Sequence, residues 1–364
     1  MMACVESYAP PVSNANSDFL VVDGFLNGSA GIASIILTRA IPLSVNIVNP
    51  PEDNAIVSIE SVSGTTFPLS EIKGGIYEAG NLTLDETTAY RLRIHTNRGA
   101  SYTSDYIKLR KSPSLDSVSW RAEPTGTQFY VTGHDPQAQT TYYRYLFKDT
   151  WQYNVTFYSY FKKVGGLPVI RDLTTEQVYD CWNSSINTEV LTASTKRLEK
   201  DVISMLPIKF IRKGSRLLSR TYSINVQQRA ISQEEYEYWN LIKKTTENLG
   251  GLFDPLPSQV IGNVRNDDDP SEQVLGYFSG GFVQEKRIFV RNVDLPPDLR
   301  GADPYDFACE LKSVPYDQPE LAGPTDVFIS TAGVPPVAWV LGTPNCSDCN
   351  SLGGSTAKPD YWPQ

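Results

Sequence analysis

Histidine is nearly absent from the sequence, and this scarcity limits its chemistry. Only two histidines, His95 and His134, occur in 364 residues, and neither has an evident serine or cysteine partner. Catalytic triads and most catalytic zinc centres rely on histidine, so the sequence gives little support to either class. We therefore predict no catalytic residue, no cofactor and no enzymatic activity.

The sequence also lacks long apolar runs and an excess of positive charge. No run approaches the ~20 apolar residues that a membrane-spanning helix requires. Acidic residues outnumber basic residues by 41 to 32, and the formal net charge is −9. Proteins that bind nucleic acids normally carry the opposite sign, so we predict no nucleic-acid partner.

The residues that are abundant favour β structure. The chain contains 20 Tyr, 14 Phe and 6 Trp, which suit pleated and half-buried surfaces. Its 25 Pro and 25 Gly supply frequent turns and would interrupt long helices. At 364 residues the chain is long enough for two domains of about 150 residues or more. The composition therefore predicts a mainly β protein with two domains.

Changes in pattern along the chain predict where these domains lie. Residues 1–17 have no apolar periodicity and read as an extended tether. Residues 18–112 contain seven or eight short β runs, which is typical of an immunoglobulin-like or transthyretin-like β-sandwich. Residues 115–364 form a larger β-rich domain whose last part, after residue 297, is predicted to be irregular.

One helix is predicted within the larger domain, near residues 232–248. Ser232 followed by Glu235 forms a capping box, in which the serine hydroxyl and the glutamate carboxylate bond to each other's backbone. Gly250 and Gly251 follow the helix and suit a left-handed C-terminus. The capping signal is strong because both of its members are present at the required spacing.

Cys4 stands apart from the other cysteines and is the candidate site of lipid attachment. Ala3 provides the small residue that precedes the modified cysteine in a lipoprotein signal. The apolar stretch of such a signal is missing, so we expect the chain to begin just inside the cleavage site. The alternative is an incidental surface cysteine.

The other four cysteines are Cys181, Cys309, Cys346 and Cys349, and we predict that they form two disulfides. Three pairings are possible, and the sequence does not choose among them. Cys346 and Cys349 also form a CxxC motif, which leaves a thiol enzyme as an alternative. A zinc site formed by all four is the other alternative, although a single CxxC is weak spacing for it.

Two further clusters could bind a ligand. Three consecutive carboxylates, Asp267, Asp268 and Asp269, form a weak candidate for a calcium site, but they lack the spacing of known calcium loops and more often form a solvated turn. The second cluster is a possible stacking platform for a sugar or a peptide, formed by Tyr142, Tyr143, Tyr145, Trp151 and Tyr153. Aromatic residues that alternate on strands more often belong to a core.

Several segments together resemble one family of proteins. They include residues 20–24 (LVVDG), 75–77 (GIY), 142–145 (YYRY), 252–260 (LFDPLPSQV), 262–263 (GN), 276–278 (GYF), 286–289 (KRIF) and 353–363 (GGSTAKPDYWP). These segments are similar to a Bacteroidota-type family of outer-membrane lipoproteins described as a domain of unknown function, family 4249. The resemblance covers nearly the whole chain.

The resemblance implies a location and a partner. It implies a lipoprotein anchored in the outer membrane and exposed at the cell surface, encoded beside a TonB-dependent transporter. The expected function is that of a non-enzymatic accessory or ligand-presenting subunit of this transporter in nutrient uptake. A free-standing surface module that binds a glycan or a peptide is the alternative, and a thiol enzyme working through the CxxC motif is the second alternative.

Overall fold

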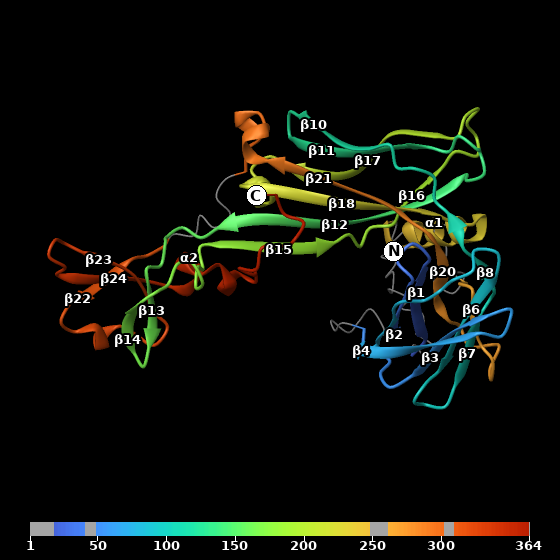
Figure 1. Ribbon diagram of the computed structural model, residues 1–364, viewed down its shortest axis with the longest axis horizontal. Coiled ribbons are helices and arrows are strands. Elements are labelled where there is room, and N and C mark those ends of the chain that lie inside the picture. The colour runs from blue at the N-terminus through green and yellow to red at the C-terminus, as the bar shows by residue number, and fades with distance from the viewer. Residues whose placement is uncertain (1–17, 41–48, 248–260, 302–308, 364) are drawn as a thin grey trace, which may run out of the picture. The chain divides into compact units, whose positions relative to one another are not determined.

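The computed structural model describes residues 18–40, 49–247, 261–301 and 309–363. Within this part of the chain, no helix is long and apolar enough to cross a membrane. Figure 1 shows a mainly β protein, as the sequence predicts. The contacts divide it into two compact units, the first of which runs to Ser112 and also contains Thr140–Arg144 and Arg229–Val283. The remaining residues form the second unit.

In the first unit, the part of the chain that the structure describes forms one curled sheet of eleven strands. Its strands are β1 Leu20–Asn27, β2 Ile32–Arg39, β3 Ile56–Ser61, β4 Thr66–Lys73, β5 Ile76–Ala79, β6 Ala89–His95, β7 Ser101–Ser104, β8 Ile107–Lys108, β9 Arg110–Lys111, β19 Val264–Asn266 and β20 Leu275–Phe282. They are arranged in the order β19-β7-β6-β3-β4-β5-β2-β1-β20-β9, and β8 pairs with β6.

Strand β4 is where the sheet folds over. Its first half pairs with β3, where Thr66 lies opposite Glu60. Its second half pairs with β5, with a shift of register between Glu71 and Lys73. Such a bulge bends a strand and increases its twist, so one strand can belong to both layers. The predicted β-sandwich is therefore formed by a single sheet that folds over at β4 into two layers.

The alternation of side chains builds the core of this sandwich. In β1, Leu20, Val22 and Leu26 point inward and have no exposed surface. They belong to one hydrophobic cluster that includes Leu92 from β6 and Tyr102 from β7. Burial of each such side chain contributes roughly 1.5–3 kcal/mol to the free energy of unfolding. The cluster thus joins the two layers of the curled sheet.

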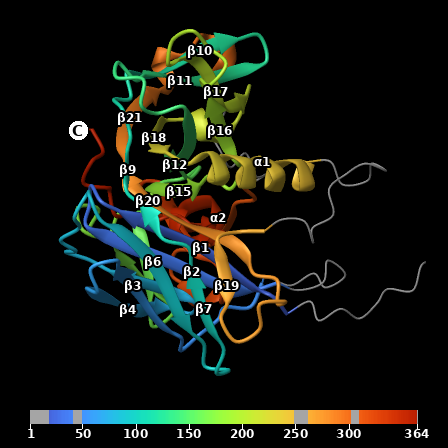
Figure 2. The same cartoon turned by 90° about the vertical axis from the view of Figure 1, so that its right-hand side faces the viewer.

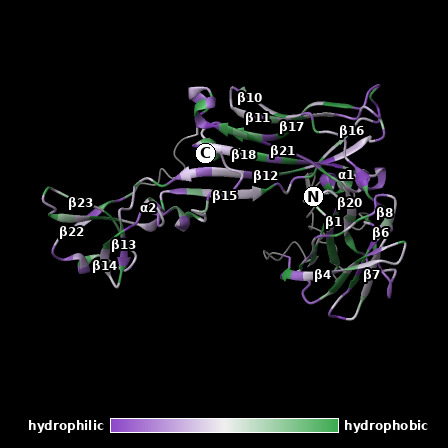
Figure 3. Ribbon diagram, viewed as in Figure 1, coloured by the Kyte–Doolittle hydropathy of each residue, from purple (hydrophilic) through white to green (hydrophobic). Residues whose placement is uncertain are grey.

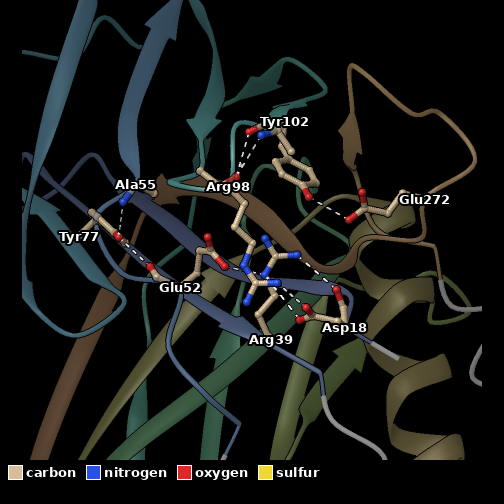
Figure 4. Close-up of polar contacts among 10 residues, drawn as sticks. Asp18, Arg39, Glu52, Ala55, Tyr77, Arg98, Tyr102 and Glu272 are labelled. Carbon is tan, nitrogen blue, oxygen red and sulfur yellow. Dashed lines mark hydrogen bonds and ion pairs between the residues drawn. The ribbon is translucent and has the colours of Figure 1, made fainter. Parts of the chain in front are cut away.

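A buried ion pair lies at one side of this core (Figure 4). Arg39 and Glu52 are each 4% exposed, and Arg39 Nε lies 2.5 Å from Glu52 Oε2. Burial acts against the charge of Arg39, but the hydrogen bond and charge of Glu52 outweigh it and raise the pKa of Arg39. Burial also raises the pKa of Tyr102 to about 12, and its hydroxyl donates to Glu272 at 2.8 Å. Removal of one member of such a pair leaves a buried charge without a partner.

Strand β20 and helix α1 (Gln233–Glu247) also belong to the first unit. β20 pairs in parallel with β1, so that Val22 lies opposite Gly276 and Gly24 opposite Phe278. Figures 1 and 2 both show α1 beside β20. The predicted helix is confirmed, and the Ser232 hydroxyl accepts from the Glu235 backbone N–H at 3.1 Å. Residues 229–247 and 261–283 therefore belong to the same unit as the N-terminal strands, although the sequence analysis placed them in the larger domain.

The described residues of the second unit form four smaller sheets. Their strands are β10 Ser117–Glu123, β11 Gly126–His134, β12 Tyr142–Asn154, β13 Phe161–Val164, β14 Leu167–Ile170, β15 Asp180–Ile186, β16 Leu191–Ser194, β17 Val202–Arg212, β18 Thr221–Ala230, β21 Gln284–Arg291, β22 Lys312–Pro315, β23 Val327–Ala332 and β24 Ala338–Gly342. Sheets are formed by β10-β11-β17, by β15-β12-β18-β21 with β16 on β12, by β13-β14 and by β22-β24-β23. In Figure 3 the strands alternate in hydropathy, whereas α1 of the first unit is largely hydrophilic.

The C-terminal part of the chain is more regular than the sequence analysis predicts. Strands β22, β23 and β24 form an antiparallel sheet around a small cluster of Phe328, Trp339 and Leu341. Short helical turns lie between the strands of this unit, namely η1 Arg216–Leu218, η3 Asn292–Asp294, η4 Pro297–Leu299 and η5 Pro319–Leu321. Two more, α2 Pro344–Ser347 and η6 Cys349–Leu352, follow β24. The expectation of an irregular C-terminus is therefore wrong for these residues, because short strands separated by prolines carry little periodic signal.

Candidate functional site

A cavity of about 440 Å³ opens in the first unit beside the N-terminal end of α1. The helix contributes Ser232, Glu234 and Glu235, and β20 contributes Tyr277 and Ser279. The rim is formed by the segment from Asp105 to Arg110, which contains the exposed side chains of Lys108 and Arg110. Its volume lies in the range of cavities that bind small molecules.

The alternation of side chains along β20 explains why polar groups face this cavity. Phe278 points into the hydrophobic cluster of the sandwich, so Tyr277 and Ser279 project from the opposite face of the strand. Helix α1 lies on that face: the rings of Tyr238 and Tyr277 are 5.2 Å apart, and the Gly276 N–H donates to the Tyr238 hydroxyl at 2.8 Å. The helix therefore fixes one wall of the cavity against the outer surface of the sheet.

Glu235 is the principal ionisable group in the wall of this cavity. It is 4% exposed, and its carboxylate accepts hydrogen bonds from Trp239 Nε1 at 3.2 Å and from the Ser279 hydroxyl. Burial raises the pKa of Glu235, while the charge of Arg144 acts in the opposite direction. Burial likewise lowers the pKa of Arg144, although the charges of Asp23 and Glu235 favour its protonated form. The two groups thus sit in a poorly solvated cluster.

Aromatic rings complete this cluster. The Arg144 guanidinium carbon lies 3.5 Å from the centre of the Trp239 ring, within the range of a cation–π contact. Burial raises the pKa of Tyr238 and of Tyr277 to about 12, so both phenols remain protonated at neutral pH. Arg144, Tyr238 and Trp239 lie behind the wall, whereas the cavity itself is lined by acids of α1, by Lys108 and Arg110 of the rim and by hydroxyl groups. Donors, acceptors and charges of both signs therefore surround the cavity, which is the chemistry of a binding site for a polar molecule.

The two histidines lie in different units. His95 Nδ1 is 3.2 Å from Ser101 Oγ, and His134 Nδ1 is 2.7 Å from Asp116 Oδ2. Within the described residues, neither pair has the third side chain that a catalytic triad requires. Among those same residues, no group of three or more His, Cys, Asp or Glu side chains is arranged to hold a metal ion.

Comparison with known proteins identifies the family. The family model described as "Domain of unknown function (DUF4249)" matches residues 5–287. The chain belongs to the DUF4249 family. No curated protein matches the chain. The match includes every described strand of the first unit and ends within β21, so the β22–β24 sheet lies beyond the matched residues.

Glycines allow a very close approach of backbones in the DUF4249 region. A Cβ on Gly276 would lie 1.8 Å from the Val22 carbonyl oxygen, and one on Gly262 would lie 1.8 Å from the Gly276 oxygen. Asn263 adds to this packing, because its amide donates to Phe278 O at 2.7 Å and accepts from Phe278 N at 2.8 Å. The motifs that carry the resemblance, at residues 20–24, 262–263 and 276–278, therefore meet beside the cavity.

The four cysteines form two disulfides, as predicted. Cys181 is bonded to Cys349, and Cys309 is bonded to Cys346. The two cysteines of the CxxC motif therefore have different partners. Only Cys181 belongs to the DUF4249 match, because the other three follow residue 287.

The aromatic band is a core and does not form an exposed platform. Tyr143, Tyr145, Trp151 and Tyr153 are between 0% and 8% exposed. The partly buried Tyr142 contacts the ring of Tyr236 at 4.8 Å. The prediction of a stacking platform is therefore wrong for the four buried rings, since the face of β12 on which they lie is covered.

The carboxylates proposed for calcium are engaged within a turn. Asp267 Oδ2 accepts from the Thr103 hydroxyl at 2.5 Å, and Asp268 Oδ2 accepts from the Ser101 N–H at 2.8 Å. Asp269 Oδ1 accepts from both the N–H and the hydroxyl of Ser271. All three side chains thus accept hydrogen bonds from the protein: Asp267 and Asp268 connect the turn to β7, and Asp269 bonds within the turn.

Two of the residues that matter here carried no clear signal in the sequence. Arg144, on β12, reaches Glu235 and Trp239, and Asn263, just before β19, reaches Phe278 of β20, in each case through contacts between distant segments. A local pattern cannot reveal such contacts. The capping box did predict Ser232 and Glu235, but as a helix start. Cys4 and the tether, residues 1–17, lie outside the described residues.

Proposed function

We propose that this DUF4249 protein is a non-enzymatic lipoprotein of the outer membrane, anchored through Cys4 and exposed at the cell surface. It acts as an accessory or ligand-presenting subunit of a TonB-dependent transporter in nutrient uptake. The observation that carries the proposal is the cavity of the first unit, whose buried acid is held by Trp239 and Ser279. A carboxylate held in this way is suited to orient a ligand, whereas a general base must be able to reach a substrate proton.

The two disulfides support a location outside the cytoplasm. Structural disulfides persist in oxidising compartments such as the bacterial periplasm and the cell surface. The bonds of Cys346 and Cys349 to different partners also count against the thiol-enzyme alternative, because a dithiol site needs both sulfurs to react together.

Exposed apolar side chains in the second unit support a protein partner. On the β13–β14 hairpin, Leu167 is 53% exposed and Ile170 is 77% exposed. Beside β24, Val334 and Val337 are 102% and 67% exposed. Large apolar side chains gathered on short hairpins mark surfaces that partners cover. In this proposal the partner is the extracellular surface of the transporter.

Fractionation of native membranes tests the anchoring. Cys4→Ser should move the protein from the membrane fraction to the soluble fraction, because each buried methylene of the lost acyl chain contributes ~0.8 kcal/mol to anchoring. The thermal unfolding of the protein should not change. Ser13→Ala, in the same tether, serves as the control and should stay in the membrane fraction. Retention of Cys4→Ser in the membrane fraction contradicts a lipid anchor at this residue.

A further inference from the structure

The two disulfides of the second unit differ in their access to solvent. Cys181 and Cys349, which form the buried bridge, are both 0% exposed. In the accessible bridge, Cys346 is 3% exposed, whereas Cys309 is only partly buried. A thiolate must touch a disulfide sulfur in order to exchange with it, so access decides which bond reacts and at which sulfur. Of these four cysteines, Cys309 is therefore the one that a thiol in solution reaches first.

The accessible bridge closes a loop that contains the whole β22-β24-β23 sheet. Its two cysteines are 37 residues apart, and all three strands lie between them. The core of this sheet is small, because its buried cluster comprises Phe328, Trp339 and Leu341 among the described residues. Structures of about 40 residues seldom fold without a cross-link, a metal or a partner. The sheet therefore depends on the bond that joins its two ends.

Other contacts hold β23 and β24 in place. The Ser159 hydroxyl donates to Phe328 O at 3.1 Å, and the Phe161 ring packs edge-on against Trp339 with 4.9 Å between the ring centres. The buried bridge also holds the chain just after β24, in η6. Strand β22 begins just after Cys309, and among the strands that the structure describes it pairs with β24 alone. Opening of the accessible bridge should therefore loosen β22 without unfolding the unit.

A hydroxyl group lies beside the sulfur that would leave during such an exchange. Thr343 Oγ1 is 3.3 Å from Cys346 Sγ. Because a disulfide sulfur carries no proton, the hydroxyl is the donor of this hydrogen bond. Hydrogen bonds to an ionised acceptor are stronger than those to a neutral one, and a stabilised thiolate leaves faster. Attack at Cys309 therefore expels a Cys346 thiolate that already has a hydrogen-bond donor.

We propose that the accessible bridge is a redox-sensitive clasp, which an external dithiol opens. One thiolate of the dithiol attacks Cys309 Sγ, the bond between the two cysteine sulfurs breaks, and Cys346 leaves as a thiolate. The second thiolate of the dithiol then attacks the dithiol sulfur of the mixed disulfide and expels Cys309 Sγ. The two protons of the dithiol pass to the two cysteines, and the dithiol is oxidised to a cyclic disulfide.

The clasp is independent of the proposed transporter. It depends on the sulfurs and strands of the second unit alone, and it would hold equally for a free-standing surface module. The redox state of the surroundings decides whether β22 is held against β24. Failure of the redox test would leave the membrane and partner tests untouched, and the reverse is also true.

Limited reduction of the full chain with dithiothreitol tests the proposal. Free thiols are first blocked with iodoacetamide, and the thiols that appear on reduction are labelled with N-ethylmaleimide and located by peptide mass spectrometry. Cys309 and Cys346 should be labelled about tenfold faster, or more, than Cys181 and Cys349, because the buried bridge must wait for local unfolding. Glutathione, which is a monothiol, should form its mixed disulfide on Cys309.

Variants of Thr343 test the role of the hydroxyl. Thr343 is exposed, so Thr343→Ala should keep the stability of the unmodified protein. It should slow the reduction of the accessible bridge about threefold to tenfold, because the leaving thiolate loses its hydrogen bond. Thr343→Ser keeps a hydroxyl and should restore the rate. Thr325→Ala, at an exposed position in the same loop, is the matched control and should leave the rate unchanged.

Hydrogen exchange measures what the clasp holds. After selective reduction, and equally in the paired variant Cys309→Ala with Cys346→Ala, the amides of β22 should exchange about tenfold faster or more. The amides of the β10-β11-β17 sheet should keep their rates. Any of four results overturns the proposal: both bridges are reduced at the same rate, glutathione is found on Cys346, Thr343→Ala is reduced as fast as Thr343→Ser, or the exchange of β22 is unchanged by reduction.

Discussion

Cys346 and Cys349 are three positions apart in the chain, yet each is bonded to a different distant cysteine. Cys349 reaches back 168 residues to Cys181, while Cys346 is bonded to Cys309, 37 residues away. The Cys349 N–H also donates to Val178 O at 2.9 Å, beside the start of β15. The two bridges thus fasten the segment that follows β24 to two separate parts of the second unit.

Removal of each bridge should destabilise the second unit to a different degree. In the chain-entropy view a longer closed loop gives more stabilisation, so the paired variant Cys181→Ala with Cys349→Ala should lose about 3–5 kcal/mol. Cys309→Ala with Cys346→Ala should lose less, about 2–4 kcal/mol. Denaturant unfolding of the two paired variants measures the difference. Alkylation of Cys346 or Cys349 in the native protein would contradict the pairing.

Gly276 should tolerate no side chain. Its φ is +102°, and an added Cβ would lie 1.8 Å from the Val22 carbonyl oxygen. Gly276→Ala should therefore break the pairing of β20 with β1 and cost about 3 kcal/mol or more. Gly64 has a similar φ of +89° with nothing within 4 Å, so Gly64→Ala should cost only about 1 kcal/mol. Equal unfolding midpoints for the two variants would show that the backbones are not in close contact.

Ionisation of Glu235 should lower the free energy of unfolding as the pH rises. Burial raises its pKa in the folded state above the ordinary glutamate value, so the folded chain binds this proton more tightly than the unfolded chain. The contribution is fully present below the unfolded pKa and is lost as the pH rises through the folded pKa. Glu235→Gln should remove this dependence, so its stability relative to the unmodified protein should rise from pH 4 to pH 8.

The neighbouring Glu234 provides a control of opposite sign. Backbone and Ser232 hydrogen bonds lower the pKa of Glu234, which is exposed. Its contribution is present at neutral pH and is lost as the pH falls through its folded pKa. Calorimetric unfolding at several pH values measures the stability of Glu235→Gln, of the corresponding Glu234 variant and of the unmodified protein. Parallel curves for Glu235→Gln and the unmodified protein would contradict a raised pKa.

Local patterns predicted the parts of the fold that depend on local interactions. The capping box located the helix, because its bonds join residues three positions apart. Alternation located strands such as β6, where Tyr90, Leu92 and Ile94 are buried. Local patterns could not predict the parallel pairing of β1 with β20. About 250 residues separate Val22 from Gly276, and nothing in the sequence of either strand identifies its partner.

The aromatic band shows a second limit of sequence patterns. Tyr143, Tyr145, Trp151 and Tyr153 occupy positions of one parity on β12, so their shared face could be predicted. Whether that face is solvated or covered depends on segments elsewhere in the chain. Tyr153, for example, is covered by residues near the C-terminus: its hydroxyl donates to Cys349 O at 2.8 Å.

Tertiary contacts also explain the C-terminal motif, residues 353–363. Trp362 is 6% exposed and packs edge-on against Phe289 with 5.4 Å between the ring centres. The Arg287 guanidinium carbon lies 3.7 Å from the centre of the Tyr361 ring, and Ser355 forms a β-bridge with Trp182. These contacts hold the tail on the β15-β12-β18-β21 sheet, which the sequence alone did not indicate.

Extraction of the protein from native membranes in mild detergent tests the central claim most directly. We predict that a TonB-dependent transporter co-purifies with it in a fixed ratio, because confinement to one membrane raises the effective concentration of the two partners. Ile170→Lys, on the β13–β14 hairpin, should reduce this ratio, whereas Ile186→Lys, on β15 and 67% exposed, should not. Recovery of a monodisperse monomer, under conditions that preserve other complexes of barrels with lipoproteins, would contradict the account.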